Sequence, residues 1–157
     1  MREILFRGKK LESGNWAIGG YFKHINRQLH PIGDCIKPKD IDHLIIQSRF
    51  ADWGMPRGVE GYEVDPETVG QWTGLVDFKG TKIFEGDILE FEYEGKRYRR
   101  AVRWFGDSGY SAFDFDRSDD FTEYNGLVWL TREGDVNCVV VGNIHDDILP
   151  ELEGVPL

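Results

Sequence analysis

The sequence predicts a mainly β protein with little helix, and three observations support this prediction. Glycine makes up 19 of the 157 residues, roughly 12% against about 7% in average proteins. The glycines separate short runs of aromatic and β-branched residues, a pattern typical of strands joined by tight turns. Apolar residues at 40% and charged residues at 30% are typical of a folded globular chain, neither disordered nor membrane-spanning.

The first part of the chain predicts a β-hairpin followed by an irregular stretch. Apolar residues alternate at Ile4 and Phe6, so Arg2–Phe6 is expected to form a strand. Ser13-Gly14-Asn15 supplies a turn, and Trp16–Phe22 returns as the second strand. Within the less regular residues 24–60, the sequence fits either a short helix over residues 39–48 or a buried strand over residues 43–46. Residues 54–61, with glycine at positions 54, 58 and 61, are expected to form a surface loop.

The sequence from Tyr62 onward has clearer strand signals. Val64–Thr68 is expected to be a strand end followed by one turn, with Pro66 fixing φ and Asp65 acting as the cap. Gly74–Gly80 is interpreted as a turn-rich link. The tail from Asp146 to Leu152 fits a helical turn or a loose end. The remaining strands are expected at residues 81–84, 88–93, 96–105, 110–115, 127–130 and 138–142.

One hairpin can be predicted with its register. With Glu94-Gly95 as a two-residue loop, Tyr93 faces Lys96, and Leu89 faces Arg100 at the far end of the pairing. The same register pairs Glu92 with Arg97 and Glu90 with Arg99 on one face, and Phe91 with Tyr98 on the other.

The basic run on this hairpin has two interpretations. It comprises Lys96, Arg97, Tyr98, Arg99 and Arg100. In the structural interpretation the arginines pair with the glutamates across the turn. In the functional one the run contacts nucleic acid or a partner, with Tyr98, Trp104 or Phe105 stacking on bases. We favour the structural interpretation, because the glutamates across the turn cancel much of the positive field.

Charge, cysteines and the N-terminus limit the partners and the compartment. The formal net charge is −9 and the pI is about 4.9, which argues against general nucleic-acid binding. Cys35 and Cys138 show no C-x-x-C spacing, and the charged N-terminus does not resemble a secretory signal. No window approaches the roughly 18 apolar residues of a membrane helix. We therefore expect a reduced, cytoplasmic protein without a membrane partner.

Metal and catalytic constellations are weak. Asp114–Asp120 resembles a calcium loop, but Asp119 stands where glycine is needed and Asn125 where a bidentate glutamate is needed, so a solvated loop is favoured. His24, His30, Cys35 and His43 do not have zinc-site spacing, and His145-Asp146-Asp147 fits an exposed tail. Nucleophile and phosphate-loop motifs are absent. We expect no catalytic residue, metal or cofactor; a metal-dependent enzyme would need Asp114, Asp116, Asp119 or His145.

The stretch from Val64 to Ile88 resembles the signature of the YopX family, small proteins of bacteriophages and prophages. The opening Arg2–Lys9 and the closing Val139–His145 are also similar to the family pattern. The resemblance implies an SH3-like β-barrel in the later half, with no established activity and no catalytic residue to carry over. Its central positions are interpreted as turns, core and a tight corner. They are Thr73, Gly74, Leu75, Asp77, Gly80, Ile83, Phe84, Glu85, Gly86, Asp87 and Ile88.

Together these observations predict a single β-rich unit over residues 1–157. It comprises a hairpin and irregular region at 1–61, the barrel region at 62–149 and a tail at 150–157. The expected function is a non-enzymatic interaction module that acts in the bacterial cytoplasm and binds an unknown protein or a second copy of itself. The alternative is a nucleic-acid-binding barrel that uses the basic and aromatic hairpin, including Trp104.

Overall fold

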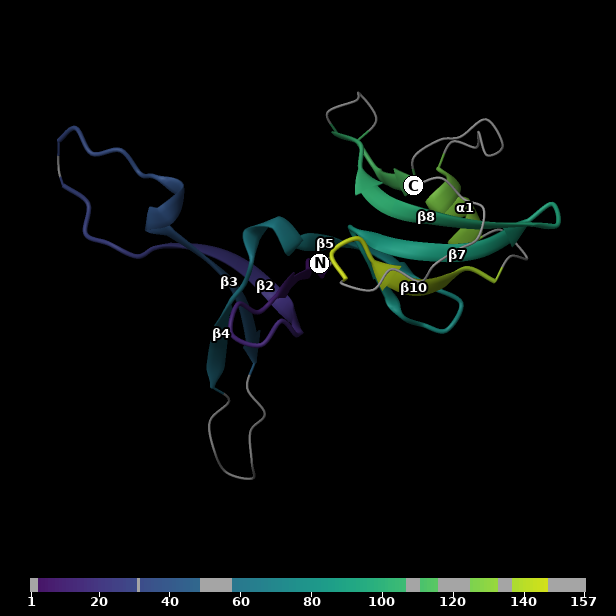
Figure 1. Ribbon diagram of the computed structural model, residues 1–157, viewed down its shortest axis with the longest axis horizontal. Helices are drawn as coiled ribbons and strands as arrows, with labels where there is room; N and C mark the ends of the chain where they lie inside the picture. Colours follow the sequence, from purple (N-terminus) through teal and green to yellow (C-terminus); the bar gives the residue numbers. More distant parts are fainter. Residues whose placement is uncertain are drawn as a thin grey trace. The chain divides into compact units, whose positions relative to one another are not determined.

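The computed structural model describes residues 3–30, 32–48, 58–106, 111–115, 125–132 and 137–146. The chain divides into two compact units, Met1–Gln71 and Trp72–Leu157, which we call the N-terminal unit and the C-terminal unit. Figure 1 shows the strands that dominate both units and the one α-helix of the described residues. The expectation of a mainly β fold with little helix is therefore confirmed.

The strands of the N-terminal unit pair in the order β4-β3-β2-β1, and β1 also pairs with the first residues of β5. All of these pairings are antiparallel. A small core of Ala17, Ile45 and Val64 lies under the sheet. The elements are β1 (Phe6–Lys9), β2 (Trp16–Ile25), the 3-10 helix η1 (Pro38–Asp40), β3 (Ile41–Ser48), β4 (Val59–Glu63), the 3-10 helix η2 (Pro66–Thr68) and β5 (Gly70–Val76).

Three boundaries in the N-terminal unit differ from the predicted ones. The first strand is Phe6–Lys9 rather than Arg2–Phe6, because Phe6 packs on the core whereas Ile4 is 57% exposed. The second strand continues three residues past Phe22, since β2 pairs with β3 as far as Ile25. β4 occupies residues 59–61 of the segment expected to be a loop. Residues 49–57 lie outside the described residues.

Residues 41–48 form a strand, which decides between the two predicted alternatives. Ile45 is fully buried opposite Tyr21 and Tyr62, so the segment gains more from pairing on both sides than from an isolated helix. The prediction around Pro66 is confirmed: η2 begins there, and the Asp65 carboxylate accepts a hydrogen bond from the Glu67 N–H at 3.0 Å.

The C-terminal unit contains a four-stranded antiparallel sheet in the order β10-β7-β8-β9, and the later part of β5 pairs with β6. Its core includes Leu89, Phe91, Val102 and Leu127. The elements are β6 (Lys82–Phe84), β7 (Asp87–Tyr93), β8 (Lys96–Trp104), β9 (Phe113–Phe115), α1 (Gly126–Arg132) and β10 (Val139–Asn143).

The predicted register of the β7–β8 hairpin is confirmed over all five pairs, from Tyr93–Lys96 to Leu89–Arg100. The loop residues Glu94 and Gly95 have φ values of 51° and 74°. Two successive positive φ values match the twist of the flanking strands, which is why a two-residue loop can close here.

Two segment predictions in the C-terminal unit are wrong. Residues 127–130 form helix α1 rather than a strand, because Leu127 and Leu130 lie one helical turn apart and both point into the core. Gly74–Gly80 is not a link throughout, since β5 extends to Val76 and the turn begins only at Asp77. The remaining expected strands agree within a few residues with β6, β9 and β10.

No sheet closes on itself in the described part of the chain, so the SH3-like barrel is not confirmed. What stands is a mainly β fold with two antiparallel sheets. Among the described residues there is no helix with the length and apolar character that crossing a membrane would require. Both cysteines are free thiols, Cys35 exposed and Cys138 buried.

Candidate interaction surfaces

The structure buries or pairs much of the predicted basic contact site on β8. Tyr98 is only 6% exposed and stacks on Phe91, with 5.5 Å between ring centroids. The Arg99 guanidinium forms an ion pair with Glu90, with Nη2 2.7 Å from Oε2. Arg100 donates from Nη1 to the carbonyl of Arg99 and lies over the Tyr98 ring. The Tyr98 ring is therefore not accessible to a stacked base.

Three members of the predicted site remain accessible: Lys96, Arg97 and Trp104. Trp104 is 47% exposed and its ring lies 4.9 Å from that of Phe113. Arg97 lies opposite Glu92, and the same two side chains line an open hollow that also includes Glu90. Arg97 and Arg99 of the basic run thus face Glu92 and Glu90, which reduces the net positive field that the strand offers to a phosphate backbone.

The family-motif residues around Asp77 hold the C-terminal unit together. The Asp77 carboxylate is 6% exposed and accepts hydrogen bonds from the N–H groups of Lys79, Thr81 and Val140. Burial alone would raise the pKa of this carboxyl, but the three N–H donors outweigh it and lower the pKa. Because Val140 lies on β10, Asp77 ties the turn after β5 to the far edge of the sheet.

A second motif cluster surrounds Asp87 at the corner between β6 and β7. Its carboxylate accepts from the N–H of Phe84 at 2.8 Å and from Asn143 Nδ2 at 3.2 Å. Gly86 has φ 84°, and a Cβ there would lie 3.0 Å from Asn143 Nδ2, so only glycine fits. Glu85 completes the turn.

The other motif residues have structural surroundings. The Thr73 hydroxyl donates to the Ile83 carbonyl and accepts from the N–H of Leu75, while Gly74 and Gly80 adopt positive φ. Ile83, Phe84 and Ile88 are buried. The motif as a whole supports the β5–β7 framework and presents no cluster of reactive side chains.

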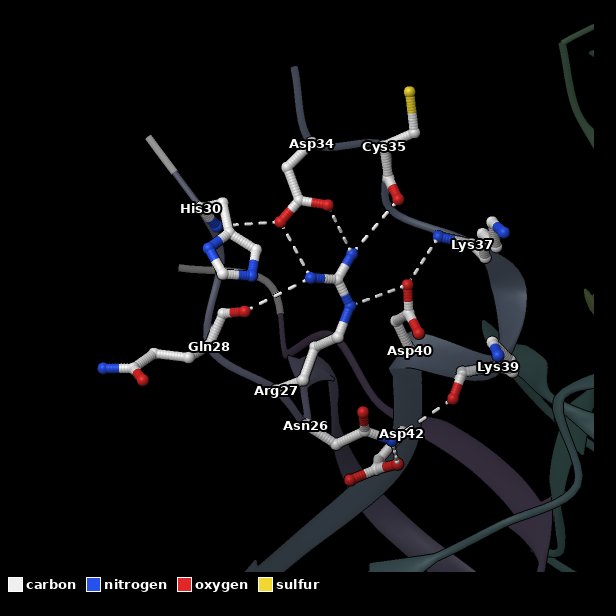
Figure 2. A network of polar contacts seen from close by, with 10 residues as sticks. All are labelled: Asn26, Arg27, Gln28, His30, Asp34, Cys35, Lys37, Lys39, Asp40 and Asp42. Carbon is white, nitrogen blue, oxygen red and sulfur yellow. Dashed lines mark hydrogen bonds and ion pairs between the residues drawn. The ribbon is translucent and has the colours of Figure 1, made fainter. Parts of the chain in front are cut away.

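The connection between β2 and β3 contains a polar network that was not predicted from the sequence. We call residues 26–40 the arm; it projects from the paired strands (Figure 1) and contributes no residue to the core of the N-terminal unit. Arg27 lies at its centre, as Figure 2 shows. The guanidinium contacts Asp34 through Nη1 and Nη2, both at 2.8 Å, and Asp40 through Nε at 2.9 Å.

Backbone groups of the arm extend this network. Arg27 also donates to the carbonyls of Gln28 and Cys35. The carboxylate of Asp34 accepts from the N–H of His30, and that of Asp40 accepts from the N–H of Lys37. One guanidinium thus fixes both sides of a loop that contains two prolines and a glycine.

The network leaves apolar side chains of the arm in solvent. Leu29 is 46% exposed, Ile36 is 48% exposed, and Ile32 at 92% is the most exposed large apolar residue among those described. Three large apolar side chains of one short loop therefore stay exposed while the polar network orders the loop around them.

The charges of the arm are distributed unevenly between its interior and its surface. Asp34 and Asp40 both contact Arg27, whereas Lys37 and Lys39 are exposed. The hydrogen bonds from Arg27 lower the pKa of Asp34 to about 2, with the His30 N–H contributing; the pKa of Asp40 is lowered by the Lys37 N–H and then by Arg27. The pKa of Arg27 is raised by the same two carboxylates. The exposed ionic groups of the arm are therefore cationic.

No group of three His, Cys, Asp or Glu side chains that could hold a metal ion occurs among the described residues. His43 contacts the Tyr21 hydroxyl through Nδ1, and His24 lies against the ring of Phe22. Of the acidic stretch considered for calcium, Asp114 is buried and accepts from the N–H of Leu127. Asp116, Asp119 and Asp147 lie outside the described residues.

The comparisons with known proteins give a family match and a similar solved structure. A family model described as YopX protein matches residues 33–152. The chain is also similar to the crystal structure of protein EF1440 from Enterococcus faecalis. The two are 19% identical over 92% of this chain and 95% of that chain, with a TM-score of 0.43. No curated protein sequence matches significantly.

Proposed function

The chain belongs to the YopX protein family, and we propose that it is a non-enzymatic interaction module of a bacteriophage or prophage that acts in the bacterial cytoplasm. The family has no established activity, so the proposal has to rest on the surface of this chain. The contact element that we propose is the arm, and its partner is a protein.

The observation that supports the arm as the contact element is that polar contacts order it while its large apolar side chains stay exposed. Arg27 makes contacts to Asp34 and Asp40 that hold the loop, yet Ile32 is 92% exposed. Holding a loop in one conformation costs about 1–2 kcal/mol of backbone entropy per residue. A binding loop recovers this cost, because a preordered contact loses less entropy when the partner arrives.

A protein partner is favoured over nucleic acid by the same accessible groups. On β8 the ring of Tyr98 is buried and Arg99 is paired, so the exposed rings that a single strand would stack on are reduced to Trp104. The tip of the arm instead offers aliphatic side chains, which suit a pocket on a protein surface.

Affinity capture from infected or lysogenic bacteria tests this proposal with a matched pair of variants. Ile32→Asp places a charge on the arm, and Ile18→Asp places the same charge on β2, where the side chain is 42% exposed. We expect the wild-type chain and I18D to retain the same partner protein, and I32D to lose it. Direct binding of the purified partner then has to show the same order. Equal retention by I32D and I18D contradicts the proposal.

A further inference from the structure

The surface around β4 is acidic. The described residues between Ile41 and Val69 include no lysine or arginine. They include the carboxylates of Asp42, Glu60, Glu63, Asp65 and Glu67. Lys9 and Lys10 reach this region from β1, where Lys10 bridges to Val64, so carboxylates still outnumber cations there. An acidic surface of this kind attracts cationic side chains over about 10 Å at 0.1 M salt.

Apolar groups lie among these carboxylates. Val59 is 74% exposed, and Ile46 is half-buried on the same face of the sheet. Ile46 pairs with Gly61, where an added Cβ would meet no heavy atom within 4 Å beyond its neighbours in the chain, so the space beside Ile46 is open. β4 is also the last strand of its sheet in the described part of the chain, which leaves one edge open to another chain. We call Ile46, Val59, Glu60, Gly61 and Glu63 the β4 surface.

The arm has the complementary character. Its internal carboxylates, Asp34 and Asp40, contact Arg27, whereas Lys37 and Lys39 are exposed. The same loop exposes the large apolar side chains of Leu29, Ile32 and Ile36. The arm therefore presents apolar and cationic groups together, and the β4 surface presents apolar and anionic ones.

Within one chain the arm and the β4 surface lie apart. The arm joins β3 at Ile41, while Val59 pairs with Ser48 at the other end of that strand. β3 has eight residues, so its two ends are about 23 Å apart. The arm also projects away from the paired strands (Figure 1). A contact between the two surfaces therefore requires two chains.

From these observations we propose that the arm of one copy binds the β4 surface of a second copy, which rests on the proposed function because it names the occupant of the same arm. The apolar side chains of the arm cover Ile46 and Val59, and its two lysines lie against Glu60 and Glu63. Burial of the apolar groups supplies affinity, and the opposite charges supply attraction and orientation.

The native cysteines allow a direct test without changing the sequence. Cys35 lies exposed on the arm and Cys138 is buried, so a maleimide-linked photocrosslinker attaches to the arm alone. The labelled chain is mixed with an unlabelled chain made with heavy nitrogen, and illumination is followed by mass spectrometry. We expect crosslinks from Cys35 to heavy peptides that contain β3 or β4. Crosslinks confined to other heavy peptides, or no crosslink between chains, overturn the proposal.

Mass in solution gives an independent readout. We expect the weight-average mass to rise above the 18.1 kDa of one chain as concentration increases. Ile32→Asp and Val59→Asp should each weaken the association at least about tenfold, because each places a charge in an apolar contact. Phe78→Asp is the matched control and should leave it unchanged, since Phe78 is 70% exposed but belongs to the C-terminal unit. A mass of one chain at every concentration, or equal effects of V59D and F78D, contradicts the proposal.

Exchanging the charges tests the pairing itself. One double variant carries Lys37→Glu and Lys39→Glu on the arm, and the other carries Glu60→Lys and Glu63→Lys on the β4 surface. Each alone should associate at least about tenfold more weakly than the wild type, because its arm and β4 surface then have the same sign. An equimolar mixture should associate again, since each arm meets a surface of opposite charge on the other variant. A mixture that associates no better than the separate variants contradicts the pairing.

Two outcomes separate this association from the proposed function. A chain that stays monomeric but captures another protein through Ile32 removes the self-association and leaves the interaction module standing. A chain that assembles while I32D has no effect on either assembly or capture removes the role of the arm altogether.

Discussion

At the scale of single residues, the two thiols have opposite environments. Cys35 is exposed on the arm, while Cys138 is 1% exposed in the core of the C-terminal unit. Burial raises the pKa of the Cys138 thiol to about 12, and the nearby Asp77 carboxylate adds to the shift. Only a thiolate reacts with disulfide reagents, so the two side chains should differ in rate by orders of magnitude.

A thiol-exchange assay checks this difference. In the native chain at neutral pH we expect one thiol to react quickly, and peptide mapping to place it at Cys35. The second should react only after denaturant unfolds the chain. Two thiols reacting at similar rates in the native chain would show that the core around Cys138 is open.

A second residue-scale prediction concerns the pH dependence of the arm. The pKa of Asp34 is lowered from 3.8 to about 2, chiefly by its hydrogen bonds from Arg27. A carboxyl whose pKa is lower in the folded chain stabilises the fold above its unfolded pKa, and this effect is lost as pH falls through the folded value. The arm should therefore stay ordered at pH 4 and loosen as pH approaches 2.

Nuclear magnetic resonance of the Arg27 Nη–H groups, which donate to Asp34, follows this transition. Asp34→Asn serves as the control, because it removes the titrating group. We expect the wild-type signal to change between pH 4 and pH 2 and the D34N signal to change less, because Asp40 is then the carboxylate left to titrate beside Arg27. An unchanged wild-type signal over this range would contradict the contacts between Arg27 and Asp34.

At the scale of elements, the β7–β8 hairpin contains two charge pairs in the same register but with different contacts. Glu90 and Arg99 form an ion pair with side chains 22% and 17% exposed, whereas the opposed Glu92 and Arg97 form no ion pair. Cross-strand charge pairs contribute about 0.2–1 kcal/mol. We expect the Glu90–Arg99 pair to lie at the upper end of that range and the Glu92–Arg97 pair near zero.

Double-mutant cycles on the free energy of unfolding measure both couplings. Each cycle uses the two single alanine variants and the double variant in urea denaturation. The Glu92–Arg97 cycle is the matched control, since it lies on the same two strands. A coupling for Glu90–Arg99 that is no larger than the control value contradicts the distinction.

The elements that sequence reasoning predicted well are those fixed by neighbouring residues. The hairpin register follows from Glu94-Gly95 alone, because a two-residue loop determines every pair beyond it. Residues 127–130 were mistaken for a strand, because four apolar-rich residues do not separate strand from helix and the deciding contact, Leu127 N–H to Asp114, spans 13 positions.

The candidate site could not be predicted for a similar reason. Arg27, Asp34 and Asp40 are separated by 7 and 6 positions; seven suits a helix and six suits a strand, but neither period places all three on one face. The available signal was an arginine followed by two aspartates in a stretch with two prolines and a glycine. Such a pattern becomes informative only when the three side chains are seen to meet, as in Figure 2.

At the scale of the whole molecule, a net charge describes this chain poorly. The N-terminal unit is neutral and includes the cationic arm, whereas residues 72–157 account for the entire −9. An acidic protein can therefore present a locally basic element. In the C-terminal unit, the carboxylates of Asp77 and Asp87 have a structural role, because each accepts a hydrogen bond from a residue of β10.

The central claim is that Arg27 orders the arm before any partner binds. Amide hydrogen exchange on the isolated chain tests it most directly, with Arg27→Met as the variant and the exposed Arg103→Met as the matched control. We expect residues 26–40 to exchange more slowly than an unstructured peptide in the wild type and in R103M. The protection should disappear in R27M while β7 keeps its own. Wild-type exchange as fast as that of an unstructured peptide, or unchanged protection in R27M, would contradict the account.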